Sequence, residues 1–245
     1  MSDFSRVSKK EETSRFFPTL ICAATSWEAF PIAQALHLKA ASSDSFFGKF
    51  GGRSILLIKT GMGEAALKKR LSQLPEGGVF SRVISTGFCG ALKPELSTGD
   101  IICDGLPEVL SAKAEIIKNS LGLKVYFSPL AHAEEALYSP KLKKSFADKT
   151  GALVVDMESS PLKFWAKEKN PDCEFASIRV VLDSLEDSLP AQTPQNEKTL
   201  SFIWYFISQP RSWANFGKLY LKQRRASKIL VDFLRRLLDD SGDLK

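Results

Sequence analysis

The sequence predicts an α/β protein in three layers, with a mixed central sheet covered by helices on both faces and a helical appendage at the C-terminal end. Short apolar segments of strand length alternate with segments of helical periodicity between residues 19 and 187. Glycine turns follow two of the apolar segments, as is usual where a strand leads into a helix. Hydrophobic residues make up 44% and charged residues 25% of the chain, which is typical of a globular protein with a sizeable core.

Length and composition favour one large domain with short flanking segments. We expect the 245 residues to divide into a polar, mobile tail at 1–17, an α/β domain at 18–187 and an appendage at 188–245. No apolar run reaches the roughly 18–20 residues of a membrane span, and the polar tail lacks the apolar stretch of a secretory signal. The four cysteines are isolated, which suits buried thiols in a reducing compartment. We therefore expect a cytoplasmic protein without a metal site.

The elements follow one another in the order that a parallel or mixed sheet requires. Short apolar runs are expected to be buried strands, and Pro31 fits the first turn of the helix that follows the first run. The expected elements of the first half are a strand at 19–25, a helix at 27–38, a strand at 53–60, a helix at 64–74 and a strand at 82–86. Those of the second half are a strand at 99–103, a helix at 141–149, a strand at 152–156, a helix at 158–169 and a strand at 175–182.

The C-terminal appendage carries most of the basic character of the chain. Residues 209–236 hold eight basic residues and one acidic residue, whereas the whole chain has a net charge of +6. Ala226, Leu230, Phe233 and Leu237 share one face of a predicted helix. Aromatic and apolar residues beside the basic set favour contact with the inner membrane surface, and the alternative is that they pack on the α/β core. The residues concerned are Phe202, Trp204, Phe206, Trp213, Phe216, Tyr220, Leu230 and Phe233. No nucleic-acid-binding motif accompanies the basic residues, so nucleic acid is not an expected partner.

Polar groups and glycines follow the predicted strands at the ends where ligands bind in α/β sheets. They are Glu28, the turn Gly61-Met62-Gly63, Thr86, Gly87 and Phe88 with Gly90, Met157 and Glu158, Arg179, and Asp183. Each has a structural alternative, such as a first-turn helix residue, a simple turn or a helix cap. A buried arginine within an apolar strand, however, needs an acidic partner or a ligand.

Three carboxylates, an arginine and two glycine turns fit the cleavage of a nucleoside. The reaction passes through a ribosyl cation-like state, and a purine leaves poorly unless an acid protonates it. One carboxylic acid with a raised pKa can supply that proton, while the others bind ribose hydroxyls and orient the nucleophile. Small glycine turns let a sugar or a phosphate approach backbone N–H groups.

Taken in order, these segments resemble the superfamily of purine nucleoside phosphorylases and methylthioadenosine/adenosylhomocysteine nucleosidases. The matching segments are Ala24–Glu28, Thr60–Gly63, Ile84–Ala91 with Gly99–Ile102, Val155–Ser159 and Arg179–Asp183. They span about residues 19–187. The resemblance implies a nucleoside phosphorylase-like fold, a purine nucleoside as ligand, cleavage of its N-glycosidic bond, no cofactor, and a homo-oligomer. Inorganic phosphate would be a co-substrate only in a phosphorolysis.

The resemblance also implies roles for individual residues. Glu28 matches the acid that positions the attacking water, Asp183 the acid at purine N7, and Arg179 an arginine near the nucleophile. Glu158 matches the carboxylate that binds ribose hydroxyls, and Met157 a residue under the ribose. On the same basis we expect Met62, Gly63, Thr86, Gly87 and Phe88 to line the substrate site, with Met62 on the 5′ side.

Some positions depart from the family pattern. Glu64, Phe88 and Leu182 stand where lysine, a small or hydroxyl residue, and serine are usual, and the arginine of hexameric phosphorylases has no counterpart in residues 85–90. These departures leave phosphorolysis and hydrolysis both open.

A narrower resemblance concerns the segments 149–159, 183–190, 209–213 and 222–226, which look like the hopanoid-biosynthesis-associated members. It implies release of adenine from adenosylhopane. The alternatives are a methylthioadenosine/adenosylhomocysteine nucleosidase and a non-catalytic nucleoside-binding regulatory protein.

Overall fold

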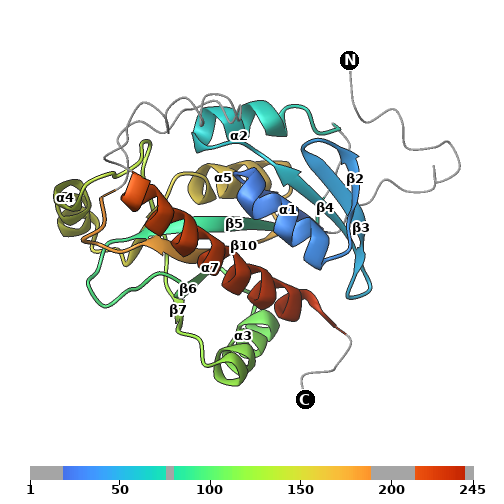
Figure 1. Ribbon diagram of the computed structural model, residues 1–245. Helices are drawn as coiled ribbons and strands as arrows, with labels where there is room; N and C mark the ends of the chain where they lie inside the picture. Colours follow the sequence, from blue (N-terminus) through green and yellow to red (C-terminus); the bar gives the residue numbers. More distant parts are fainter. Residues whose placement is uncertain (1–18, 76–79, 189–212, 241–245) are drawn as a thin grey trace, which may run out of the picture.

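A mixed sheet of ten strands forms the centre of the computed structural model, which describes residues 19–75, 80–188 and 213–240 (Figure 1). The main path of the sheet runs in the order β2-β3-β4-β1-β5-β10-β6-β7, and β8 and β9 extend it from β5. The strands are β1 (Thr19–Ala23), β2 (Lys39–Ser42), β3 (Ser45–Phe50), β4 (Arg53–Lys59), β5 (Arg82–Ala91), β6 (Ile101–Asp104), β7 (Val125–Phe127), β8 (Ala131–His132), β9 (Val154–Asp156) and β10 (Glu174–Asp183).

The four central strands β4, β1, β5 and β10 run parallel to one another. All five residues of β1 are buried, and β5 and β10 are buried over most of their length, as expected for parallel strands covered on both faces. Because these strands are parallel, their carboxyl ends lie at one edge of the sheet, where ligands bind in α/β folds.

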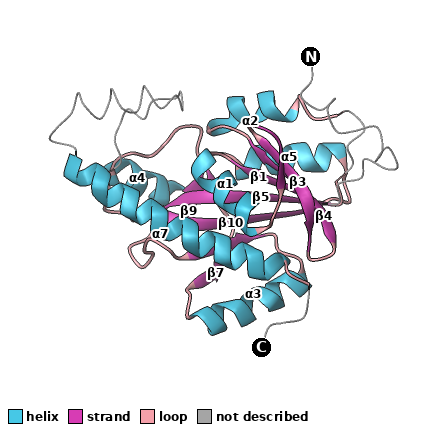
Figure 2. Cartoon of the chain, turned by 45° about the vertical axis from the view of Figure 1, so that its right-hand side comes forward, coloured by secondary structure: helices cyan, strands magenta, loops and turns pink. Residues whose placement is uncertain are grey.

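Helices cover both faces of the sheet, which gives the three predicted layers (Figure 2). They are α1 (Ser26–Ala35), α2 (Gly63–Leu71), α3 (Glu108–Leu121), α4 (Pro140–Thr150), α5 (Ser159–Lys169) and α7 (Trp213–Leu238). Buried residues of α1, α3 and α7 share one hydrophobic cluster with β1, β5 and β10. Buried residues of α2 and α5 share a second cluster on the other face.

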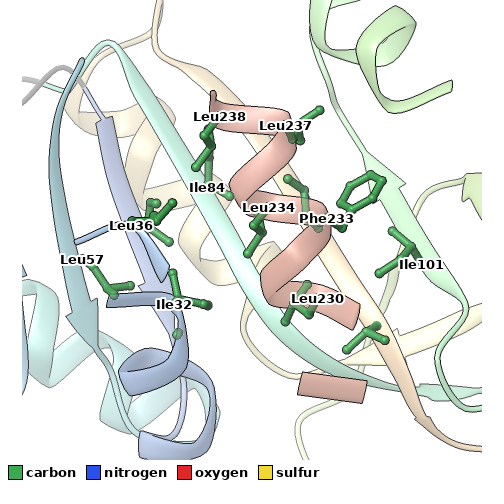
Figure 3. Packing of buried hydrophobic residues seen from close by; sticks show 14 of the residues in the cluster. Ile32, Leu36, Leu57, Ile84, Ile101, Leu230, Phe233, Leu234, Leu237 and Leu238 are labelled. Atoms are coloured by element: carbon green, nitrogen blue, oxygen red, sulfur yellow. The ribbon is translucent and has the colours of Figure 1, made fainter. Parts of the chain in front are cut away.

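The C-terminal helix α7 packs directly on the α/β core. Figure 3 shows Leu230, Phe233 and Leu234 of α7 beside Ile32 of α1 and Ile84 of β5. The predicted apolar face is confirmed, since Ala226, Leu230, Phe233 and Leu237 are buried. Leu230 and Phe233 therefore do not face a lipid surface, which corrects that part of the sequence interpretation. Phe202, Trp204 and Phe206 lie outside the described residues, and the side chains of Trp213 and Phe216 are not described.

Several elements differ from the sequence prediction in their bounds. The strand predicted at 82–86 continues to Ala91, because residues 87–90 pair with β10 and residues 90–91 pair with β9. The hairpin β2–β3 and helix α3 were not predicted. β2 is a polar, largely exposed edge strand of four residues, so it lacks the apolar pattern on which strand prediction depends.

Among the helices of the described ranges, none is long and apolar enough to cross a membrane.

Candidate active site

Glu28 lies in the first turn of α1, directly beyond the carboxyl end of β1. Its carboxylate accepts hydrogen bonds from the backbone N–H of Thr25 (2.7 Å) and from the Thr25 hydroxyl (2.9 Å), which completes a capping box at the start of the helix. The second carboxylate oxygen accepts from the backbone N–H of Phe88 on β5 (2.8 Å). The side chain is only 3% exposed. Glu28 is thus both a helix cap and a buried acid that faces β5.

Gly87 makes room for this carboxylate. Its φ is +144°, a conformation that side-chain-bearing residues rarely adopt. A Cβ at this position would lie 2.3 Å from Glu28 Oε1 and 2.8 Å from Arg179 Nη1. Glycine at residue 87 therefore allows an acid from α1 and a cation from β10 to meet at the backbone of β5.

Arg179 is buried within β10 and is held by oxygen atoms from three elements. Its guanidinium forms an ion pair with Asp156 (2.6 Å) and donates to Ser85 Oγ (2.7 Å) and Ser159 Oγ (3.1 Å). It also donates to the carbonyl oxygen of Thr86 (3.3 Å). Asp156 is the acidic partner that a buried arginine requires, and it fixes the guanidinium beside Glu28 and Glu158.

Glu158 precedes α5 and connects two segments that are distant in the chain. One carboxylate oxygen accepts a hydrogen bond from the backbone N–H of Gly63 at the start of α2 (2.9 Å), and the other lies 3.7 Å from Arg179 Nη2. A Cβ on Gly63 would be 3.5 Å from the Met157 methyl group, so Met157 adjoins the same turn. Met62 is 44% exposed and lies at the outer side of this turn.

The middle of β5 supplies the remaining predicted binding residues. Thr86 is fully buried, and within the described ranges its hydroxyl oxygen has no hydrogen-bond partner. Phe88 is half-buried and packs against the cluster beneath α1 and α7. Both residues lie at the strand segment that also contacts Glu28 and Arg179.

Asp183 is the last residue of β10, opposite Gly90 of β5. Its carboxylate is 4% exposed and forms an ion pair with Lys143 of α4, which is itself 1% exposed. The Lys143 ammonium also donates to the carbonyl oxygens of Ser184 (2.7 Å) and Asp187 (3.0 Å). A third buried acid, which has its own cationic partner, therefore lies at the same edge of the sheet.

Burial shifts the proton affinities of the three candidate acids in the same direction. Loss of hydration raises the pKa of Glu28, Glu158 and Asp183 above the ordinary values, although the nearby cation in each case opposes the rise. For Glu28 and Glu158 the opposing cation is Arg179, and for Asp183 it is Lys143. Carboxyl groups with raised pKa values in one region of a sheet edge are candidates for acid–base catalysis.

The structure brings most of the predicted site residues together. Glu28, Gly87, Phe88 and Arg179 adjoin one another, and Arg179 connects them to Glu158 and Gly63. Asp183 lies four residues further along β10, and Met62 and Met157 border the turn before α2.

Sequence reasoning did not assign a role to Asp156, Ser85, Ser159 or Lys143. The first three lie inside the segments that carried the family resemblance. The resemblance marked these segments as a whole and did not distinguish the roles of single residues within them. Lys143 lies in a lysine-rich helix, Pro140–Thr150, whose sequence resembles a solvated face. Its burial depends on where α4 meets the end of β10, and local sequence does not encode that contact.

Comparison with known proteins shows a partial family match and a shared fold. Residues 19–103 match the family model described as the phosphorylase superfamily. No curated protein sequence matches the chain. Among solved structures, methylthioadenosine/S-adenosylhomocysteine nucleosidase from Campylobacter jejuni is 15% identical, with a TM-score of 0.64 over 91% of this chain and 99% of that one.

Two further structures share the fold. Futalosine hydrolase from Helicobacter pylori is 16% identical, with a TM-score of 0.65 over 91% of this chain and 97% of that one. A putative methylthioadenosine/S-adenosylhomocysteine nucleosidase from Borrelia burgdorferi, bound to adenine, is 19% identical, with a TM-score of 0.62 over 89% and 99%. The phosphorylase superfamily model thus matches the N-terminal strands of this chain, and the described residues share the fold of these nucleosidases and of futalosine hydrolase.

Proposed function

We propose that this protein hydrolyses the N-glycosidic bond of a 5′-modified adenosine and releases adenine. The observation that carries the proposal is a set of three buried acids with raised pKa values along one end of β10: Glu28 and Glu158 lie beside the fixed cation Arg179, and Asp183 lies beside Lys143. Cleavage of a nucleoside needs a base for the nucleophile, a partner for the ribose hydroxyls and an acid for the leaving purine. The three acids can fill these three roles.

Water fits this site better than phosphate does. Four carboxylates, of Glu28, Asp156, Glu158 and Asp183, adjoin the two buried cations Arg179 and Lys143, and each cation is already paired with a carboxylate. A phosphate dianion would bring two more negative charges next to Glu28 and Glu158, and like charges at this distance repel strongly in a buried site. Hydrolysis therefore requires no additional cation.

Glu28 is the proposed base. Its carboxylate is oriented by Thr25 and by the Phe88 N–H, so it can direct a water molecule toward the anomeric carbon. A pKa raised by burial increases the basicity of the carboxylate, which helps it accept the proton of that water at neutral pH.

Glu158 and Asp183 would contact the two ends of the substrate, the ribose and the purine. Glu158 would accept hydrogen bonds from the ribose hydroxyls, as it accepts one from the Gly63 N–H. Asp183, with its raised pKa, would protonate the purine at N7 and so make adenine a neutral leaving group.

For the 5′ substituent we propose an apolar group, with adenosylhopane as the leading candidate. The support is the sequence resemblance of the chain to the hopanoid-associated members, together with the exposed surface near the site. Trp27 precedes Glu28 and is 55% exposed, and it contacts Tyr220 of α7 edge to face, with ring centroids 6.0 Å apart. An aromatic pair beside the catalytic helix suits an extended apolar substituent.

We also propose that the protein contacts the membrane surface, where such a substrate would lie. Tyr220 and Leu221 are exposed on α7, and so are the basic residues Arg224, Arg225 and Lys228. Exposed apolar and basic side chains on one helix are typical of interfacial helices.

Self-association into a homo-oligomer is a separate proposal, which rests on the family resemblance. Light scattering of the purified protein tests it.

Adenine release measures the proposed activity directly. The full-length protein is incubated with adenosylhopane, methylthioadenosine, adenosylhomocysteine and adenosine, each with and without inorganic phosphate. Adenine should form without phosphate, and free ribosyl product rather than its 1-phosphate should accumulate. Preference for the sulfur nucleosides would favour the alternative nucleosidase. Adenine binding without turnover of any substrate would favour a regulatory nucleoside-binding protein.

Asp183→Asn provides the matched loss-of-function variant in the same assay. Removal of a general acid usually lowers the rate about 10²–10⁴-fold, so kcat should fall by that amount. The variant should still bind adenine and still show a measurable melting temperature. Wild-type turnover in this variant would contradict the assignment of Asp183.

A further inference from the structure

Lys143 is a buried cation that the roles assigned above do not use. Its side chain is 1% exposed, and three oxygen atoms surround its ammonium group: Asp183 Oδ2, the Ser184 carbonyl and the Asp187 carbonyl. An ammonium has three N–H donors and no acceptor, so all three donors are satisfied when Lys143 is charged. Lys143 thus binds both the end of β10 and the turn that follows it.

A buried ion pair of this kind needs an explanation other than stability. Removing two charges from water is costly, and apolar residues of similar volume often stabilise a fold equally well or better. The pair lies at the carboxyl end of β10, four residues beyond Arg179, rather than in a structural corner of the protein. Its position therefore points to a role in the site.

We propose that Lys143 is a positioning residue for Asp183: it holds the carboxylate by one oxygen, leaves the other to face the purine, and sets the pH range in which Asp183 acts. The inference rests on the proposed function, because Asp183 is taken as the group at purine N7. The contact with Lys143 occupies Oδ2, so Oδ1 is the oxygen available to a ligand.

The surroundings of Asp183 favour Lys143 as the group that controls it. Asp187 in the following turn and Lys222 of α7 form their own ion pair at 2.6 Å, and the Cys89 thiol of β5 is buried nearby. The Lys143 charge lowers the pKa of Asp183 against the larger effect of burial, which raises it. Loss of the Lys143 charge should therefore let Asp183 keep its proton to higher pH.

Lys143→Met tests the proposal, with Lys144→Met as the matched control. Lys144 is the next residue of α4, but it is exposed and pairs with Glu186 at the surface. For Lys143→Met we expect a loss of about 10–100-fold in kcat, a part of the roughly 10²–10⁴-fold that a general acid contributes. The alkaline limb of the kcat/KM profile should move to higher pH. Lys144→Met should leave kcat and the limb unchanged. Wild-type kcat and an unmoved limb in Lys143→Met would overturn the proposal.

Lys143→Arg covers the case in which the methionine variant does not fold. Arginine keeps the charge but presents a longer, planar group. The alkaline limb should therefore stay in place while kcat falls because the carboxylate is displaced. Wild-type kcat in this variant would show that the position of the carboxylate does not depend on Lys143.

Adenine binding supplies a readout that requires no turnover. Calorimetry gives the adenine Kd of the wild type, Lys143→Met, Asp183→Asn and the double variant across the pH range. If Lys143 acts through Asp183, its substitution should change the Kd less than about two-fold in the Asp183→Asn background, because the two effects are not additive. An equal effect in both backgrounds would overturn the proposal. A wild type that binds adenine but cleaves no nucleoside would contradict the proposed function alone.

Discussion

At the scale of single residues, the site depends on a few contacts across long stretches of chain. Gly63 N–H binds the Glu158 carboxylate, and Phe88 N–H binds the Glu28 carboxylate. Each acid is therefore oriented by a backbone donor from a distant element, α2 for Glu158 and β5 for Glu28. A ligand that replaces one of these donors meets a carboxylate that is already fixed in direction, which lowers the entropy lost on binding.

Glu158→Gln should separate binding of the sugar from binding of the base. If Glu158 accepts hydrogen bonds from ribose hydroxyls, the amide should weaken nucleoside binding by about 1.5–3 kcal/mol, the usual value for hydrogen bonds to a charged group. Free adenine has no ribose, so its Kd should change little. Calorimetric titration with both ligands measures the difference. Equal losses for nucleoside and adenine would indicate a structural role for Glu158.

As the pH is lowered, the activity should be lost at a higher pH than the ordinary pKa of a glutamate would predict. Glu28 must be ionised to act as a base, and burial raises its pKa. Activity is therefore lost as the pH falls through this raised pKa, and it is retained above it. The acid limb of the kcat/KM profile reports the free enzyme. A limb at the usual pKa of an exposed glutamate, near 4.3, would argue against Glu28 as the base.

The residues that sequence reasoning could assign share a local signal. Glu28, Glu158 and Asp183 follow apolar runs, so their place at the sheet edge was predictable from the order of strands and helices. Lys143 lacked such a signal, because its role depends on a partner 40 positions away, Asp183. Asp156 does follow an apolar run, but its role depends on Arg179, 23 positions away. Sequence periodicity describes exposure along one element and not the contacts between elements.

At the scale of elements, periodic apolar spacing predicted α7 well, and the absence of such spacing explains the elements that were missed. Four apolar residues at helical spacing identified the buried face of α7. The second half of β5, by contrast, has the sequence Gly87-Phe88-Cys89-Gly90, which resembles a turn. It is a strand because β10 and β9 supply its hydrogen-bond partners. Pairing between strands overrides local preference there.

Phe233→Ala tests whether α7 is part of the core. The Phe233 side chain is 0% exposed, and its removal should destabilise the protein by about 3–5 kcal/mol. Phe164→Ala on α5 is the matched control, because Phe164 is 74% exposed and its loss should change stability by less than about 0.5 kcal/mol. Urea unfolding measures both. A small effect in both variants would mean that α7 contributes little to the stability of the domain.

At the scale of the whole molecule, both helical layers carry exposed basic residues. Exposed basic residues of α7 lie on the layer that also contains α1 and α3, whereas α5 presents its exposed lysines on the other face of the sheet. Anionic headgroups attract each nearby basic residue by about 1 kcal/mol. The proposed membrane contact through α7 therefore predicts that vesicles bind one of these two faces and not the other.

Charge substitutions in the full chain test membrane contact better than truncation does, because removal of α7 would uncover the core. The triple variant Arg224→Gln, Arg225→Gln, Lys228→Gln should lose binding to phosphatidylserine vesicles, and wild-type binding should decrease as salt rises. The control replaces Lys163, Lys167 and Lys169 of α5 with Gln and should still sediment with the vesicles. Equal sedimentation of both triple variants, or no sedimentation of the wild type at low salt, would contradict membrane contact through α7.

The position of α7 on the core also determines when the domain can be completed during synthesis. Ser227 of α7 donates a hydrogen bond to the Trp27 carbonyl, 200 positions earlier in the chain. A ribosome that adds about 5–20 residues per second needs roughly 10–40 s to make that stretch. Throughout this interval the faces of β1 and α1 that α7 covers are without their partner, and exposed apolar surface on a nascent chain promotes aggregation. The surface of β1 and α1 that α7 buries can therefore be covered only after α7 has left the ribosome.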